Sequence, residues 1–182
     1  MISHEYRCIF IHQRKCAGTS IMRSFGVESG TPEWNFANEG VLGKDRAQWP
    51  AGYVVVSAVR NPWDRFVSGW KYLKATRDLS LRDLLSSLPE SGHDYRHLVR
   101  PQSAIRVNSD GTPVWDHLLR FETLQDDYDR LSDRIGKPRT PLPLAKKGER
   151  DDYRRYYDVD TAERVGSLFR EDIERFGYAF DR

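Results

Sequence analysis

The sequence has 182 residues, a formal net charge of +2 and 38% hydrophobic residues. This length and composition suit one domain over residues 1–182, and so small a charge does not indicate a nucleic-acid-binding surface. No apolar run approaches the roughly 20 residues of a membrane span, and the first residues lack the apolar stretch of a signal peptide. The two cysteines, Cys8 and Cys16, form neither a disulfide framework nor a C-x-x-C zinc pair. We therefore expect a cytoplasmic protein with reduced thiols, no membrane span and no nucleic-acid partner.

Residues 8–20 predict a strand, a loop and the start of a helix. Residues 8–11 are apolar and partly β-branched, which indicates a buried strand. The loop after it holds Lys15 and Gly18, and a helix is predicted over 19–25. Backbone N–H groups at a helix start bind anions, and a glycine allows a ligand to approach closely. The segment therefore predicts a site for a phosphate or a similar group.

The order of residues in this loop differs from the Walker A loop. In G-x-x-x-x-G-K-[ST] the lysine follows the second glycine. Here Gln13 takes the first glycine position, Thr19 takes the lysine position, and Lys15 stands before Gly18. From there its ammonium group can reach the leaving-group side of a phosphate-linked donor. A chance K-x-x-G-T-S pattern in a surface turn is the alternative interpretation.

A second strand-to-helix segment carries an arginine. Residues 53–59 form a continuous β-branched run, which predicts a buried strand that ends at Arg60. Asn61 is a favourable N-cap and Pro62 suits the first helical position. Ser68 lies about one and a half turns into the helix, so that Arg60 and Ser68 can converge on one anion. The alternative is a solvated arginine and a neutral serine on the helix surface.

The remaining predicted elements are an irregular segment over 27–49 with a short strand near 34–36, a helix over 79–88, a strand over 114–121, a helix over 125–135 ending at Gly136, and a C-terminal helix that includes Val165 to Phe176. Between the helices, Arg100 and Gln102 either orient an acceptor or fasten a loop.

The two strand-to-helix segments together resemble the sulfotransferases that use 3′-phosphoadenosine 5′-phosphosulfate (PAPS). "IHQRKCAGTSI" is most similar to the 5′-phosphosulfate loop of the carbohydrate-type, family 2-like branch, which usually reads H-x-P-K-x-A-G-T-S. Arg14 replaces the usual proline. "VRNPWDRFVSGW" resembles the 3′-phosphate motif R-[ND]-P-x-x-R-x-x-S. The resemblance implies a P-loop NTPase-like, three-layer α/β fold with a small central, mainly parallel sheet flanked by helices.

The resemblance also implies roles for individual residues. Lys15 is expected to donate to the bridging oxygen of the donor, while Arg60 and Ser68 hold its 3′-phosphate and Arg65 has a structural role. PAPS would be the donor and 3′-phosphoadenosine 5′-phosphate (PAP) the product, with no metal required. The other expected cofactor-binding residues are Arg14, Ala17, Gly18, Thr19, Ser20 and, in a basic stretch that is alternatively a solvated charge run, Lys147.

The acceptor hydroxyl needs a general base within hydrogen-bond reach. The family uses His or Glu, and Glu39 and His97 are equal candidates here, followed by His93. The resemblance implies a small-molecule or carbohydrate acceptor, with carbohydrate favoured by the branch, and a lipid or a peptide tyrosine as alternatives. A P-loop-type nucleotide kinase and a non-catalytic nucleotide-binding protein on the same fold are the alternatives to a sulfotransferase.

Overall fold

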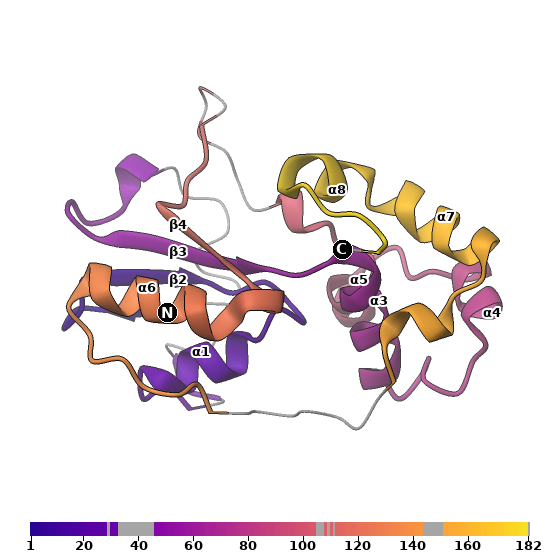
Figure 1. Ribbon diagram of the computed structural model, residues 1–182, viewed down its shortest axis with the longest axis horizontal. Coiled ribbons are helices and arrows are strands. Elements are labelled where there is room, and N and C mark those ends of the chain that lie inside the picture. Colours follow the sequence, from indigo (N-terminus) through magenta and orange to yellow (C-terminus); the bar gives the residue numbers. More distant parts are fainter. Residues whose placement is uncertain are drawn as a thin grey trace. The chain divides into compact units, whose positions relative to one another are not determined.

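The computed structural model describes residues 1–28, 30–32, 46–104, 108, 110, 112–143 and 151–181 (Figure 1). The chain divides into two compact units. The first comprises Met1–Val59 and Ile105–Lys147, and the second comprises Arg60–Ala104 and Gly148–Arg182. The single domain over residues 1–182 stays a prediction. The predicted short strand near 34–36 lies outside the described residues.

The first unit contains a four-stranded sheet in the order β1-β2-β3-β4. The strands are β1 (Ile2–Ser3), β2 (Cys8–Ile11), β3 (Val54–Val59) and β4 (His117–Arg120). β1 runs antiparallel to β2, whereas β2, β3 and β4 are parallel. The protein is therefore α/β with a small, mostly parallel sheet flanked by helices, and this part of the predicted fold is confirmed.

The strand predicted over 114–121 is shorter than expected. Asp116 ties the segment before β4 to the neighbouring strand, because its backbone N–H donates to the Val55 carbonyl at 2.7 Å and its carboxylate accepts from the Val55 N–H at 2.7 Å. After Arg120 the chain turns into the 3-10 helix η4 (Phe121–Thr123). The Asp116 side chain therefore replaces a backbone carbonyl as the acceptor at one position of the β-ladder, and regular pairing of β4 with β3 begins only at His117.

Helices α1 (Gly18–Ser24) and α6 (Leu124–Ile135) pack against one face of this sheet (Figure 1). Alternate residues of the strands point toward them, as the period of two in a strand requires. α6 ends at Gly136 in the left-handed conformation, with φ of 69°, as predicted. The fully or almost fully buried core consists of Met1, Cys8, Phe10, Cys16, Ile21, Met22, Val56, Ala58, Leu119, Tyr128 and Leu131.

The second unit is helical. Its helices are α3 (Pro62–Tyr72), α4 (Leu81–Ser86), α5 (Gly92–Leu98), α7 (Val159–Leu168) and α8 (Arg170–Phe176), with 3-10 turns η3 (Gln102–Ala104) and η5 (Tyr153–Tyr156). The apolar face of α3 lies at the centre of its core, which consists of Trp63, Phe66, Val67, Trp70, Leu73, Leu81, Leu84, Leu85, Leu98, Val165 and Phe169. A further 3-10 turn, η2 (Arg46–Gln48), belongs to the first unit.

The C-terminal helix predicted through Val165 and Phe176 is instead two helices that meet at Phe169. Phe169 has φ of −114° and ψ of 27°, outside helical geometry. Its N–H still bonds the Val165 carbonyl at 3.1 Å, and its own carbonyl accepts from Ile173 at 3.0 Å. The Phe169 side chain is buried against Phe66, at 6.2 Å between ring centroids. The break between the two helices coincides with the tertiary packing of Phe169. The helical pattern of the sequence does not reveal this break.

None of the helices in the described ranges is long and apolar enough to cross a bilayer.

The start of α7 predicts a measurable acid sensitivity. The Asp158 carboxylate accepts from the Thr161 N–H at 2.8 Å and pairs with Arg82 at 2.7 Å, and these contacts lower the pKa of Asp158 from 3.8 to about 2. A lowered folded-state pKa stabilises the fold above the unfolded pKa, and that stability is lost as pH falls from about 4 to about 2. Asp158→Asn keeps a cap but removes the charge. We expect a lower urea midpoint for this variant at pH 7 and a shrinking difference from wild type between pH 4 and 2. Asp78→Asn, at a side chain that is 85% exposed, is the control. A difference in urea midpoint between Asp158→Asn and wild type that stays constant with pH would contradict the role assigned to the Asp158 charge.

Candidate functional site

The loop between β2 and α1 begins with a tight turn. The Cys16 N–H donates to the Gln13 carbonyl at 3.4 Å, and Lys15 at the third turn position has φ of 69°. Arg14, at the second turn position, does not have a positive φ. A positive φ at the third position alone defines a type II turn. Proline is common at the second position of such turns. Arg14 stands at that position, so the turn that a proline would favour forms here without one.

Two residues of this loop have left-handed backbone conformations that side chains disfavour. Lys15 has φ of 69° and Ala17 has φ of 59°, and neither is a glycine. A left-handed non-glycine residue costs roughly 1–2 kcal/mol. Alternation of left-handed with ordinary residues turns successive backbone N–H groups toward one side, as in the anion-binding nests of phosphate loops. The loop therefore has the backbone form of an anion site, with Lys15 and Thr19 half-buried and Ser20 buried.

Gly18 is required by a neighbouring side chain. A Cβ at this position would lie 1.9 Å from Cδ2 of His12. The His12 ring stacks on Phe10, with 6.1 Å between the centroids, so it cannot move toward the sheet without disturbing β2. From the sequence, the absence of a Cβ was expected to admit a ligand. The structure shows that the His12 ring occupies that space.

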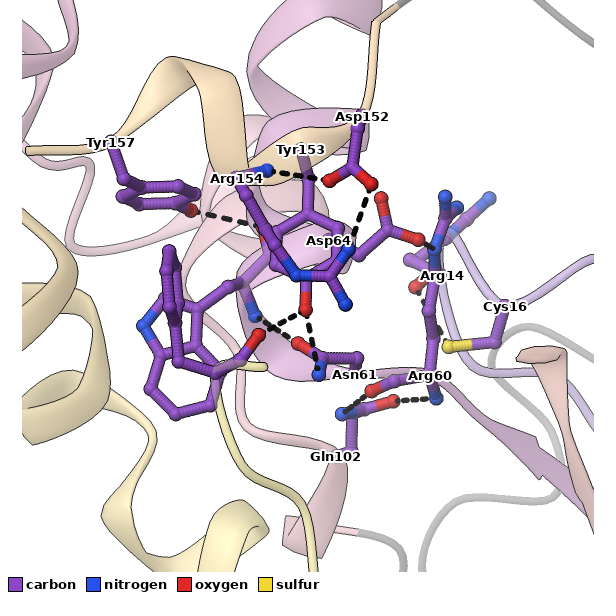
Figure 2. Close-up of polar contacts among 12 residues, drawn as sticks. Arg14, Cys16, Arg60, Asn61, Asp64, Gln102, Asp152, Tyr153, Arg154 and Tyr157 are labelled. Carbon is purple, nitrogen blue, oxygen red and sulfur yellow. Dashed lines mark hydrogen bonds and ion pairs between the residues drawn. The ribbon is translucent and has the colours of Figure 1, made fainter. Parts of the chain in front are cut away.

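Arg60 lies at the junction of β3 and α3, as predicted. Asn61 caps the helix, since its side-chain oxygen accepts from the Trp63 N–H at 3.1 Å, and Pro62 is the first helical residue. The Arg60 Nε donates to Asp64 at 2.6 Å (Figure 2). Only 6% of the Arg60 side chain and 13% of the Asp64 side chain are exposed. The arginine is thus held in a defined position by an internal carboxylate.

Ser68 lies one helical turn after Asp64, so the two side chains share one face of α3. This face of the second unit presents Arg60, Asp64 and Ser68 in order. Ser68 is half-buried. The pairing of Asp64 with Arg60 was not predicted from the sequence, although the i,i+4 spacing of the two residues is typical of an ion pair.

Gln102 fastens the main chain of Arg60. Its side-chain oxygen accepts from the Arg60 N–H at 2.8 Å, and its side-chain nitrogen donates to the Arg60 carbonyl at 2.9 Å (Figure 2). Of the two roles considered for Gln102, the structure shows the fastening one. Arg65 is almost fully buried, donates to the Arg100 carbonyl at 2.9 Å and lies 4.8 Å above the Phe169 ring, which agrees with a structural role.

The C-terminal segment binds the start of α3. The Asn61 amide donates to the Ala179 carbonyl at 2.9 Å. It also donates to the Tyr153 hydroxyl at 3.3 Å (Figure 2). Tyr153 in turn donates to the Phe180 carbonyl, and burial raises the pKa of Tyr153, which keeps its hydroxyl protonated. The Phe180 ring contacts Trp63, with 5.5 Å between centroids. The aromatic residues near the C-terminus are therefore packing groups around the Arg60 motif.

The candidate general bases differ in what can be said of them. His97 is 5% exposed, and its ring stacks on the Tyr72 ring with 5.0 Å between the centroids. The His93 ring lies 4.4 Å from the His97 ring and is tilted by 40°. Glu39 and Lys147 lie outside the described residues. Their roles, and that of His97, stay predictions. Within the described part of the chain, no group of three or more His, Cys, Asp or Glu side chains is arranged to hold a metal ion.

Comparison with known families agrees with these motifs. The model of the Sulfotransferase family matches residues 1–179. Because this match spans nearly the whole chain, the protein belongs to the sulfotransferase family, in the family 2-like branch that its motifs resemble. The family places it among transferases and supports sulfotransferase activity in general. No curated protein matches the chain.

The contact between His12 and Gly18 predicts an unusual response to alanine. An alanine in a helix is ordinarily favoured over glycine, by about 1 kcal/mol. Here Gly18→Ala should destabilise the protein by about 1–3 kcal/mol, because the new Cβ overlaps the His12 ring. In a His12→Ala background the same change should be neutral or stabilising. Urea unfolding of both single variants and the double variant measures the coupling. Additive effects would contradict the contact.

Proposed function

We propose that the protein transfers the sulfuryl group of PAPS to a hydroxyl of a small-molecule or carbohydrate acceptor by in-line displacement, and releases PAP. The observation that carries this proposal is the conformation of Lys15. A lysine occupies a left-handed position where a glycine would be less strained, in a chain that belongs to the sulfotransferase family. Strain of this kind in a loop points to a function for the residues that carry it.

The two motifs start at neighbouring strand ends. β2 and β3 are parallel, and Ile11 pairs with Ser57, so the loop after β2 and the residue after β3 begin at the same edge of the sheet. Ligands of open α/β sheets bind at the carboxyl ends of the strands. This arrangement of the sheet supports a P-loop-like fold.

The donor set suits PAPS. The backbone of residues 14–20 has the form of an anion nest, and Arg14, Lys15, Ala17, Gly18, Thr19 and Ser20 are proposed to hold the 5′-phosphosulfate. Arg60 and Ser68 are proposed to hold the 3′-phosphate. Asp64 engages Nε of Arg60 and so orients the guanidinium group that is proposed to bind this phosphate. The basic stretch around Lys147 is proposed as a further contact to the nucleotide.

PAPS supplies an activated sulfuryl group. The acceptor oxygen forms a bond to sulfur as the bond from sulfur to the bridging oxygen breaks, and the electron pair of that bond passes to the 5′-phosphate of PAP. Lys15 stabilises the charge that develops on the bridging oxygen, which is the electrostatic role that matters most in such transfers. A general base accepts the proton of the acceptor hydroxyl. Glu39, His97 and His93 are the proposed candidates for this step. The stacked and buried ring of His97 has less access to an acceptor than the exposed ring of His93.

No metal is assigned a role in this scheme, and the cytoplasm is the proposed location. Both cysteines are buried thiols, and burial raises the pKa of Cys8 to about 12, so that its thiol stays protonated. Free thiols that form no disulfide suit a reducing compartment.

Calorimetry with nucleotides tests the proposal directly. We expect the protein to bind the product PAP, also called 3′,5′-ADP, at micromolar concentrations without added metal. We also expect it to bind 3′,5′-ADP more tightly than 5′-AMP. Mg²⁺-dependent binding of ATP without binding of 3′,5′-ADP would instead indicate a nucleotide kinase. Binding of 3′,5′-ADP without transfer of labelled sulfate to any member of a broad hydroxyl panel would indicate a non-catalytic nucleotide-binding protein.

Lys15→Ala should lower turnover by roughly 10²–10³, because it removes one preorganised donor to the leaving group. The affinity for 3′,5′-ADP should change far less, since this product lacks the sulfuryl group. Transfer of labelled sulfate gives the turnover number, and Lys74→Ala, at an exposed lysine, is the matched control. Turnover equal to that of the control would rule out the proposed role of Lys15.

Arg60→Ala should weaken binding of 3′,5′-ADP by about 10- to 100-fold, the range expected for hydrogen bonds to a charged group. Binding of 5′-AMP should change little, because it has no 3′-phosphate. Titration calorimetry with both nucleotides measures the two affinities on the same protein. An equal loss for both nucleotides would show that Arg60 does not recognise the 3′-phosphate.

A further inference from the structure

The main chain of Arg60 lies where neither regular element can satisfy it. β3 ends at Val59, and the first backbone bond of α3 runs from the Arg65 N–H to the Asn61 carbonyl at 2.8 Å. The N–H and carbonyl of Arg60 therefore fall between the ladder and the helix. Buried backbone groups of this kind need partners. The carboxamide of Gln102 bonds both of them, at 2.8 Å and 2.9 Å.

A carboxamide suits this position better than any other side chain of its size. The Arg60 backbone offers one donor and one acceptor side by side, and an amide presents an acceptor and a donor in the same plane without having to take up a proton. A glutamate would accept from the N–H but would place a second oxygen against the Arg60 carbonyl. Gln102 is fully buried, so that water does not compensate for a mismatch.

Gln102 is itself held by a buried carboxylate from the C-terminal helix α8. Asp172 is fully buried, and its oxygens accept from the backbone N–H of Gln102 at 2.8 Å and of Ser103 at 2.6 Å. Arg175, one turn later on α8, donates to the Ser103 carbonyl at 3.1 Å. The turn η3 is therefore fixed to α8, and Gln102 is fixed with it. Burying a carboxylate is costly, and here its hydrogen bonds anchor the segment that holds Arg60.

We propose that Gln102 and Asp172 are positioning residues that set the selectivity for the 3′-phosphate by holding the backbone of Arg60. The inference rests on the proposed function of Arg60. Asp64 fixes the guanidinium end, and Gln102 fixes the backbone end, so the arginine is oriented before a ligand arrives. Preorganisation of this kind raises affinity because less freedom is lost on binding.

Gln102→Glu is the sharpest test, since it changes one NH₂ group to oxygen. We expect the affinity for 3′,5′-ADP to fall about tenfold or more while the affinity for 5′-AMP changes little, and KM for the donor to rise more than kcat falls. The matched control is Gln125→Glu. Gln125 also bonds a backbone carbonyl, of Thr140 at 3.3 Å, and a backbone N–H, of Leu142 at 2.9 Å, but it is exposed and lies on α6.

Asp172→Asn is the second variant, in case Gln102→Glu does not fold. Its amide nitrogen must face one of the two backbone N–H groups that the carboxylate accepts from, so the anchor is loosened. We expect a smaller loss of 3′,5′-ADP affinity in the same direction. Thermal unfolding of each variant identifies those that are folded at the assay temperature.

The outcomes separate the two proposals. Wild-type protein that binds 3′,5′-ADP no better than 5′-AMP would overturn the proposed function. Wild-type protein that prefers 3′,5′-ADP, with the same preference in folded Gln102→Glu and Asp172→Asn, would overturn only the positioning role. A lower unfolding temperature with unchanged preference would mean that Gln102 and Asp172 serve stability alone.

Discussion

The second unit depends on how one residue, Arg60, is held where a strand becomes a helix. A chain that leaves a sheet and enters a helix at once has a residue whose backbone groups belong to neither. Gln102 supplies both missing partners from a turn that follows far along the chain, and α8 fixes that turn through Asp172. On the other side, Asn61 caps α3 and binds the Ala179 carbonyl. The C-terminal segment thus stabilises the Arg60 motif from two directions, which explains why aromatic residues close to the chain end belong to the core of the unit.

The loop between β2 and α1 is built differently. Its backbone carries local strain, at Lys15 and Ala17. The strain is confined to a turn that is anchored at both ends, by the buried strand β2 and by the contact of His12 with Gly18. Proteins keep such conformations where the surroundings over-determine them, and where the resulting orientation of backbone and side chain has a use.

The sequence predicted what short-range physics controls. The buried strands over 8–11 and 53–59, the Asn61 cap, the first helical Pro62 and the left-handed Gly136 follow from local pattern, and the structure agrees. The errors arose where a contact distant in sequence decides the local structure. Asp116 shortens β4 by taking a ladder position on β3, and the break at Phe169 accompanies its packing against Phe66. In the candidate site, the His12–Gly18 contact and the bonds from Gln102 to Arg60 have no periodic signature, since neither of them joins two residues on the same face of one helix or strand.

The pairing of Arg60 with Asp64 bears on how the arginine can be studied. A buried guanidinium needs a counter-charge when no ligand is present, and Asp64 provides it at 2.6 Å. Replacing Arg60 alone therefore removes the group proposed to bind phosphate and also leaves a mostly buried carboxylate beside the vacated position. That carboxylate would repel any phosphate, even one held by Ser68. A loss of affinity in Arg60→Ala combines both effects, whereas Arg60→Ala in an Asp64→Asn background removes the repulsion. The difference between the two variants separates attraction by the arginine from repulsion by its internal partner.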